Sequence, residues 1–302
     1  MSALLLRGVV KRYGKERGLD GLDLEVPRGS VFGLVGPNGA GKTTTFGIVS
    51  GALRADAGSV DILGGGGFDA SKHAGRVSVL PQDCALNAHS SASQLLTFFA
   101  RLQGMSAKEA RKDAERVLDL VKLRERADAR VGQLSHGMRR RLAVAQAFLG
   151  APELVLLDEP TGGLDPALVV DMRELLKSQA RKRTLIVSTH ILADIESTCD
   201  HVAFLEAGRC VRSGPLKELT KHAGLVRIRL AAPTPLDSHA SLLRGREARV
   251  VGDELHYVLH PDEDVAEVQA RLIPALIEGG LRILEISLGE SLEATYLRSK
   301  EP

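Results

Sequence analysis

The chain has few aromatic side chains and few cysteines. Tryptophan is absent, and aromatic residues make up 3% of the 302 positions. The three cysteines, Cys84, Cys199 and Cys210, are odd in number and scattered, and no C-x-x-C pair occurs. This argues against a disulfide framework and against a zinc site. It favours reduced, mostly buried thiols in a cytoplasmic protein.

Long apolar runs and a strong net charge are also lacking. No segment reaches the roughly 18 apolar residues that a membrane-spanning helix needs, so we expect none. The apolar run at residues 3–6 is short for a signal peptide and precedes the charged residues, so it favours a first strand. The formal net charge is +2 without a basic cluster, and no nucleic-acid partner is expected.

A complete phosphate-binding loop is present. Residues 36–44 match the pattern G-x-x-x-x-G-K-[ST] at every specified position. Glycines let backbone N–H groups surround an anionic phosphate chain that larger residues would obstruct. Lys42 would reach the β- and γ-phosphates, and Thr43 would ligate Mg²⁺. The nucleotide-binding residues expected here are Gly36, Asn38, Gly39, Ala40, Gly41, Lys42, Thr43 and Thr44.

The sequence around this loop supports the interpretation. Residues 30–35 form an apolar run suited to a buried strand, and a helix is expected from Thr44 onward. The alternative is an ordinary glycine-rich turn with a surface lysine, which the complete pattern between strand and helix argues against. The loop alone does not distinguish kinases, GTPases, motors and transporters.

An acidic pair follows a second buried strand. Residues 154–157 are fully apolar, as expected of a central parallel strand, and Asp158 and Glu159 come directly after them. Asp158 would hold the hydration shell of Mg²⁺ opposite Thr43. Glu159 is placed to polarise an attacking water as general base. The alternative is a strand that merely ends in solvated acids.

Strands and helices alternate along the first part of the chain, which predicts an α/β domain over residues 1–220. Residues 221–302 predict a small α+β domain. The strands expected in the first domain are 4–12, 22–26, 31–35, 59–63, 76–80, 154–157, 184–188, 202–206 and 210–213. The helices expected there are 43–53, several within 92–131, 142–149, and 166–182 with Asp165 as its cap. The second domain is predicted from a strand at 225–230, a hairpin about 252–253, an amphipathic helix at 265–277 and a strand at 281–286.

Four further motifs occur in the order and spacing of one family. Gln82 follows a strand, residues 134–141 read Leu-Ser-His-Gly-Met-Arg-Arg-Arg, residues 161–166 read Thr-Gly-Gly-Leu-Asp-Pro, and His190 ends Ser-Thr-His. They resemble the Q-loop, signature, D-loop and H-loop of ATP-binding-cassette (ABC) ATPases. The resemblance covers residues 1 to about 220. It implies a P-loop NTPase fold with a mixed sheet core, an antiparallel β subdomain and a helical subdomain at about 92–150.

The same resemblance implies a site shared between two cassettes. Two copies, or two paired cassette ATPases, would face each other head to tail and close two ATP molecules between them. The implied catalytic residues are Gln82, Glu159 and His190, and the implied ligands of Mg²⁺ are Thr43, Gln82 and Asp158. The other copy would contribute its signature residues Ser135, His136, Gly137 and Met138, while Asp165 lies in the D-loop.

Two positions in this family pattern leave alternatives open. Tyr13 falls where the family stacks an aromatic ring on adenine, although a core or surface tyrosine is the alternative. The signature at 135–138 is Ser-His-Gly-Met, where the family usually has Ser-Gly-Gly-Gln. His136 would slow turnover, require a different partner, or point away from the nucleotide. Our hypothesis is a working site with altered turnover.

A second resemblance concerns one branch of the family. Met138 with its arginine run, and the residues 288–297, are similar to a bacterial drug- and antibiotic-export branch of the daunorubicin-resistance, ABC-2 type. This implies an ATPase on the cytoplasmic face of the cell membrane that drives a separate integral-membrane permease. The exported compound would be a drug, an antibiotic or another hydrophobic molecule. Residues 82–88 and 93–102 would receive short helices of the permease, unless they are simply a solvated face.

Two other functions remain as alternatives. A cytosolic cassette ATPase acting on nucleic acid or ribosomes generally has two cassettes or long coiled coils, and this chain shows neither, nor a basic stripe. A nucleotide-gated regulatory module would bind ATP without hydrolysing it, and the presence of Glu159 and His190 argues against that function.

Overall fold

The computed structural model describes residues 2–220, 225–231, 248–251, 253–259, 265–289 and 292. The chain divides into two compact units, Met1–Leu216 and Lys217–Pro302. The division falls at the first residue of the short helix α8 (Leu216–Leu219), slightly before the boundary at residue 220 that the sequence predicts.

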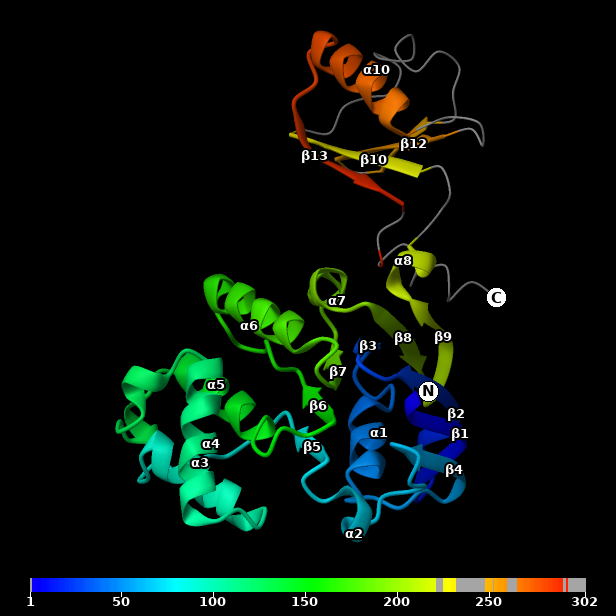
Figure 1. Ribbon diagram of the computed structural model, residues 1–302. Coiled ribbons are helices and arrows are strands. Elements are labelled where there is room, and N and C mark those ends of the chain that lie inside the picture. The colour runs from blue at the N-terminus through cyan, green and yellow to red at the C-terminus, as the bar shows by residue number, and fades with distance from the viewer. Residues whose placement is uncertain are drawn as a thin grey trace. The chain divides into compact units, whose positions relative to one another are not determined.

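A six-stranded sheet runs through the first unit (Figure 1), in the order β5-β6-β7-β3-β8-β9. The first five strands are parallel, and β9 is antiparallel to β8. Strands β3, β6 and β7 are buried along their whole length, as parallel strands covered on both faces are. The strands of this sheet are β3 (Val31–Val35), β5 (Val77–Leu80), β6 (Leu154–Asp158), β7 (Thr184–Thr189), β8 (His201–Glu206) and β9 (Arg209–Pro215).

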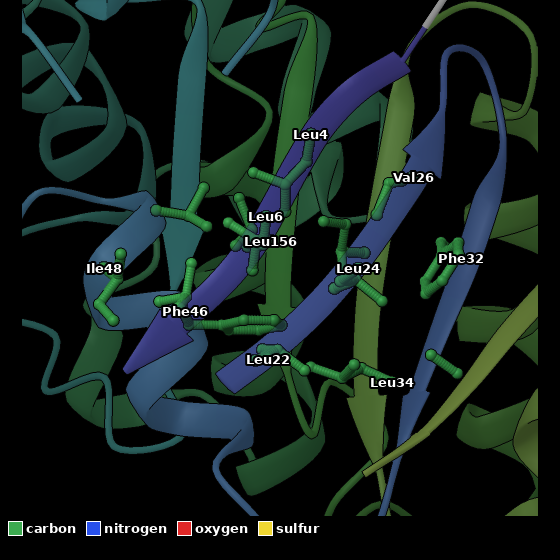
Figure 2. Close-up of a cluster of buried hydrophobic side chains, with 14 of the residues drawn as sticks. Leu4, Leu6, Leu22, Leu24, Val26, Phe32, Leu34, Phe46, Ile48 and Leu156 are labelled. Atoms are coloured by element: carbon green, nitrogen blue, oxygen red, sulfur yellow. The ribbon is translucent and has the colours of Figure 1, made fainter. Parts of the chain in front are cut away.

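A second, antiparallel sheet has the strand order β2-β1-β4. It consists of β1 (Ser2–Tyr13), β2 (Glu16–Pro27) and β4 (Ala57–Ile62), and its apolar side chains share a core with helix α1 (Lys42–Val49). Figure 2 shows Leu4 and Leu6 of β1, Leu22 and Leu24 of β2, Phe46 of α1 and Leu156 of β6 in this core. The core therefore fixes the helix that begins at Lys42 between the two sheets.

Three helices, α3, α4 and α5, gather at the end of the first unit opposite the antiparallel sheet (Figure 1). They are α3 (Ala92–Leu102), α4 (Ala107–Leu120) and α5 (His136–Ala147). Reciprocal capping boxes at Ser91 and Ser106 begin the first two. Helix α5 begins at His136, so the predicted start at residue 142 was wrong, although residues 142–147 are helical as predicted. The three arginines before residue 142 interrupt the apolar pattern and hid this first turn.

Two helices lie beside the parallel strands in Figure 1. Helix α6 (Pro166–Gln179) begins as predicted, because the Asp165 side chain accepts a hydrogen bond from the N–H of Leu168 at 3.0 Å. It ends before residue 182. Helix α7 (Leu192–Thr198) was not predicted, and neither was the four-residue helix α2 (Ala70–His73). Of the helices that the structure describes, none combines the length and apolar character needed to cross a membrane.

The second unit is a small α+β unit, as the sequence predicts. Its antiparallel sheet has the order β11-β12-β10-β13, and α10 joins β12 to β13 on either side of β10, a split β-α-β arrangement. Gly252 of the predicted hairpin lies outside the described residues, as do 290, 291 and 293–297 of the segment likened to the export branch. The elements are β10 (Leu225–Leu230), β11 (Ala248–Val251), β12 (Glu254–Val258), α10 (Val265–Glu278) and β13 (Ile283–Leu288).

Candidate functional site

The phosphate loop joins the end of β3 to the first residue of α1. A Cβ at Gly36 would collide with the carbonyl oxygen of Leu205. Gly41 has a φ of 105°, and a Cβ there would lie 2.7 Å from the carbonyl oxygen of Gly18. Both positions therefore require glycine, for steric room at the first and for backbone conformation as well at the second.

Lys42 is buried, and its ammonium group is hydrogen-bonded to the phosphate loop itself. Its Nζ donates hydrogen bonds to the carbonyl oxygens of Gly36 (2.7 Å) and Pro37 (3.0 Å). Burial lowers the pKa of Lys42, while the nearby charges of Glu159 and Asp158 oppose that shift. The predicted contact of Lys42 with a nucleotide would require the ammonium group to exchange these carbonyl oxygens for phosphate oxygens.

Thr43 and Asp158 meet at the edge of the parallel sheet. The Thr43 hydroxyl donates to Asp158 Oδ2 at 3.1 Å, and the hydroxyl of Ser188 donates to the other carboxylate oxygen. Sequence reasoning gave Ser188 no role of its own. It lies directly opposite Asp158 in the parallel pairing of β6 and β7, so the ends of the two strands were the signal that could have found it.

These oxygen groups fit a magnesium ion. Mg²⁺ prefers oxygen ligands and is usually held by one or two carboxylates together with phosphate and water. In the described part of the chain, no cluster of three or more His, Cys, Asp or Glu side chains could hold a metal by itself. The hydroxyl of Thr43 and the carboxylate of Asp158 therefore suit an ion that arrives with a nucleotide.

Glu159 lies between the two other residues expected to be catalytic. Its Oε1 is 2.7 Å from Nδ1 of His190, and its Oε2 accepts a hydrogen bond from Nε2 of Gln82 at 3.4 Å. The structure therefore brings the side chain of Gln82 to that of Glu159. The role of Gln82 as a metal ligand stays a prediction.

A cavity of about 380 Å³ is lined by most of these groups, but His190 and Ser188 are not part of its lining. Its wall includes Tyr13, which is 46% exposed. The ring of Tyr13 packs over Gly18, since a Cβ on that glycine would lie 2.7 Å from Tyr13 Cε2. The ring is thus open for contact with a ligand, and stacking on adenine stays a prediction. The lining residues are Tyr13, Glu16, Arg17, Gly18, Asn38, Gly39, Gly41, Lys42, Thr43, Thr44, Gln82, Asp158 and Glu159.

The signature residues form the start of α5 and do not line this cavity. Ser135 is the N-cap, and its hydroxyl accepts from the N–H of Met138 at 3.2 Å. Gly137 is buried, and a Cβ there would collide with Leu168 of α6. His136 lies by the D-loop of the same chain, since its Nε2 would be 3.0 Å from a Cβ on Gly163.

Two groups of hydrogen bonds near the site, one around Asp194 and one around Arg140, were missed by sequence reasoning. The Thr161 hydroxyl, at the start of the D-loop, donates to Asp194 Oδ2 at 2.5 Å, and Arg173 of α6 donates to Oδ1 of the same carboxylate. Arg140 of α5 donates to backbone carbonyls beside Glu159. Both groups of hydrogen bonds join segments distant in sequence, which a motif does not reveal.

Comparison with known proteins decides the family. Residues 19–162 match the family described as ABC transporter. The Nod factor export ATP-binding protein I of Burkholderia orbicola is 37% identical over 297 residues, which is 97% of this chain and 95% of that protein. The chain belongs to the ABC transporter family. It is an ABC ATPase, which binds ATP and hydrolyses it.

A further relative and a solved structure also support the assignment of this chain to the ABC ATPases. The daunorubicin resistance ATP-binding protein DrrA3 of Streptomyces coeruleorubidus is 34% identical over 294 residues, 95% of this chain and 92% of that protein. The solved structure of cbiO1 from Clostridium perfringens, part of an ABC transporter complex, matches with a TM-score of 0.66 and 28% identity over 72% of this chain and 90% of that one. The predicted ABC ATPase fold is confirmed.

Proposed function

We propose that this ABC ATPase is the ATP-hydrolysing subunit of an exporter. It works on the cytoplasmic face of the cell membrane and drives a separate integral-membrane permease. The match to proteins named for Nod factor export and daunorubicin resistance over nearly the whole chain supports export. A drug, an antibiotic or another hydrophobic compound is the proposed cargo.

The observation that carries the enzymatic part is the position of Glu159 beside His190 and Gln82. Glu159 accepts a proton from the water that attacks the γ-phosphate, and the hydrogen bonds from its two neighbours fix the carboxylate. Lys42 neutralises the phosphates. Thr43 and Asp158 would hold Mg²⁺, which would supply charge stabilisation of the transferred phosphoryl group.

A second cassette completes the site. Ser135 and Gly137 lie at the start of α5, outside the cavity that contains the phosphate loop. These signature groups can face a γ-phosphate only if it belongs to another copy or to a paired ATPase. Closure of two cassettes removes water from the phosphates and adds fixed hydrogen-bond donors around the developing charge.

A groove of about 490 Å³ offers a place for the permease. It is lined by residues 82–86 together with His136, Arg139, Arg140 and Ala143. On α3, within the predicted contact region 93–102, Phe98 and Leu102 are 56% and 68% exposed. We assign the groove and the exposed face of α3 to short permease helices, because the groove includes Gln82 and because apolar side chains are exposed on α3.

The substitution Glu159→Gln tests the enzymatic part. We expect the ATPase rate to fall about 100- to 1000-fold while ATP is still bound, because the general base is lost and the phosphate loop is intact. Size-exclusion chromatography with ATP and Mg²⁺ should then show a trapped dimer. Glu153→Gln, at a half-buried acid just before the same strand, is the matched control and should keep the native rate. Native hydrolysis by Glu159→Gln would refute the assignment.

Export is tested separately. The chain is reconstituted in liposomes with the permease encoded beside it, and ATP-dependent movement of daunorubicin or another hydrophobic drug is measured. Transport that disappears with Glu159→Gln supports the proposal. A neighbouring gene without membrane spans, or drug movement that is independent of ATP, would contradict it.

A further inference from the structure

One guanidinium on α5 contacts the backbone of two loops of the site. Nη2 of Arg140 donates hydrogen bonds to the carbonyl oxygens of Asp158 (2.8 Å) and Glu159 (2.6 Å). Nη1 donates to the carbonyl oxygen of Gln82 at 3.1 Å, and Nε reaches that of Pro160 at 3.4 Å. A single side chain therefore connects the Q-loop to the turn that carries Glu159.

The hydrogen bonds of Arg140 go to carbonyl groups, and the residue is half-buried. Burial lowers the pKa of Arg140, while nearby negative charges, including those of Asp158 and Glu159, oppose this shift. A desolvated cation is costly unless its donors are satisfied. A purely solubilising role, such as an exposed arginine has, does not account for this side chain.

The turn that Arg140 holds is strained. Glu159 has a φ of 48°, in the left-handed region, which costs a residue with a Cβ roughly 1–2 kcal/mol. On one side, the N–H of Glu159 donates to the carbonyl oxygen of Ser188 at 3.0 Å. On the other side, Arg140 binds the carbonyl oxygens of Asp158 and Glu159. The guanidinium therefore supports a conformation that the backbone does not favour by itself.

We propose that Arg140 is a positioning residue for ATP hydrolysis, which fixes the Glu159 carboxylate relative to the Q-loop. This inference rests on the proposed role of Glu159 as general base. Gln82 is connected to Glu159 twice, through its own side chain and through Arg140. Arg140 also lines the groove assigned to the permease, so a molecule in that groove touches the residue that holds the base.

The chemistry of arginine suits this role. Its planar fork directs several N–H groups to separate acceptors at once, whereas lysine offers one compact charge on a flexible stem. Lysine at position 140 would keep the charge and lose most of the simultaneous contacts. Glutamine at position 140 would lose both the charge and most of these contacts.

Kinetics of Arg140→Gln provide the first test. We expect kcat to fall about 10- to 100-fold, with KM and the affinity for ATP changed less than about twofold, because the base is misplaced while the phosphate loop is intact. Arg140→Lys should lie between the native protein and Arg140→Gln. Arg116→Gln is the control, since this arginine of α4 also donates to a backbone carbonyl oxygen, that of Phe148 at 2.8 Å, outside the site, and it should keep the native kcat.

A double-mutant comparison provides the second test. If Arg140 acts through Glu159, then Arg140→Gln should lower the residual rate of Glu159→Gln less than about twofold. Equal losses in the two backgrounds would overturn the inference, as would equal losses in Arg140→Gln and Arg116→Gln or a parallel loss of ATP affinity. If Arg140→Gln does not fold, Arg140→Lys carries both tests. Native hydrolysis by Glu159→Gln would instead refute the base itself.

Discussion

The ring of His136 lies against the D-loop of its own chain, where its Nε2 would be 3.0 Å from a Cβ on Gly163. Gly163 has a φ of 70°, so this loop has a backbone conformation that glycine permits. A ring in this position restricts the backbone conformations that the D-loop can adopt near its start. Of the three possibilities that the sequence left open, the geometry favours an effect on turnover through the D-loop.

We predict that His136→Gly changes the ATPase rate. Removal of the ring frees Gly163, and we expect a rise in kcat of about threefold or more, equivalent to roughly 0.65 kcal/mol in the barrier. Steady-state ATPase assays measure it. His136→Ala is the companion variant, because it removes the ring without adding the flexibility of glycine to the first turn of α5. An unchanged rate in both variants would remove any functional role for this histidine.

At the scale of elements, the D-loop is tied to two helices by one buried carboxylate. Asp194 of α7 is 5% exposed and accepts hydrogen bonds from Thr161 and from Arg173 of α6. Asp194 follows His190 closely in the sequence, and its partner Thr161 follows Glu159 closely. It therefore stabilises the segment from which both the H-loop and the D-loop extend.

We predict that Asp194→Ala strongly destabilises the protein. Loss of the carboxylate leaves the Arg173 guanidinium and the Thr161 hydroxyl without their partner, at a cost of about 3–5 kcal/mol in the free energy of unfolding. Urea unfolding measures it. Asp171→Ala is the control on α6, because its exposed ion pair with Lys122 should be worth less than about 1 kcal/mol. Similar losses in the two variants would contradict this account.

The sequence predicts elements best where local pattern and structure agree. Strand β3 has the predicted bounds, and α6 begins at its predicted cap, since a continuous apolar run and a capping residue are local signals. Helix α7 spans only seven residues, too few to show a periodic pattern, and it is fixed by Asp194. The start of α5 was not predicted, because consecutive arginines interrupt the apolar pattern of its first turns.

The same distinction holds for the candidate site. The phosphate loop and the acidic strand end are contiguous motifs, so their residues could be named from the sequence. The contacts of Ser188 and Arg140 arise because strands and a helix distant in sequence are placed side by side. No spacing rule predicts them, because they depend on the pairing order of the sheet and on the direction of α5.

At the scale of the whole molecule, each unit has its own hydrophobic core. One core combines side chains of both sheets of the first unit with those of α1. The other joins β10 and β12 to α10 through residues such as Val226, Tyr257 and Leu276. Separate cores allow the two units to unfold separately, and every residue of the candidate site belongs to the first unit.

We predict two transitions in scanning calorimetry, of which ATP shifts only the one that belongs to the first unit. A ligand that binds the folded state stabilises it by mass action, and ATP at about 100 times its Kd adds about 2.7 kcal/mol. For a unit of this size, this corresponds to a rise of roughly 5–10 °C in Tm. In Lys42→Ala neither transition should move, because the loop has lost its phosphate-binding charge. A single transition that ATP shifts as a whole would show that the two units unfold together.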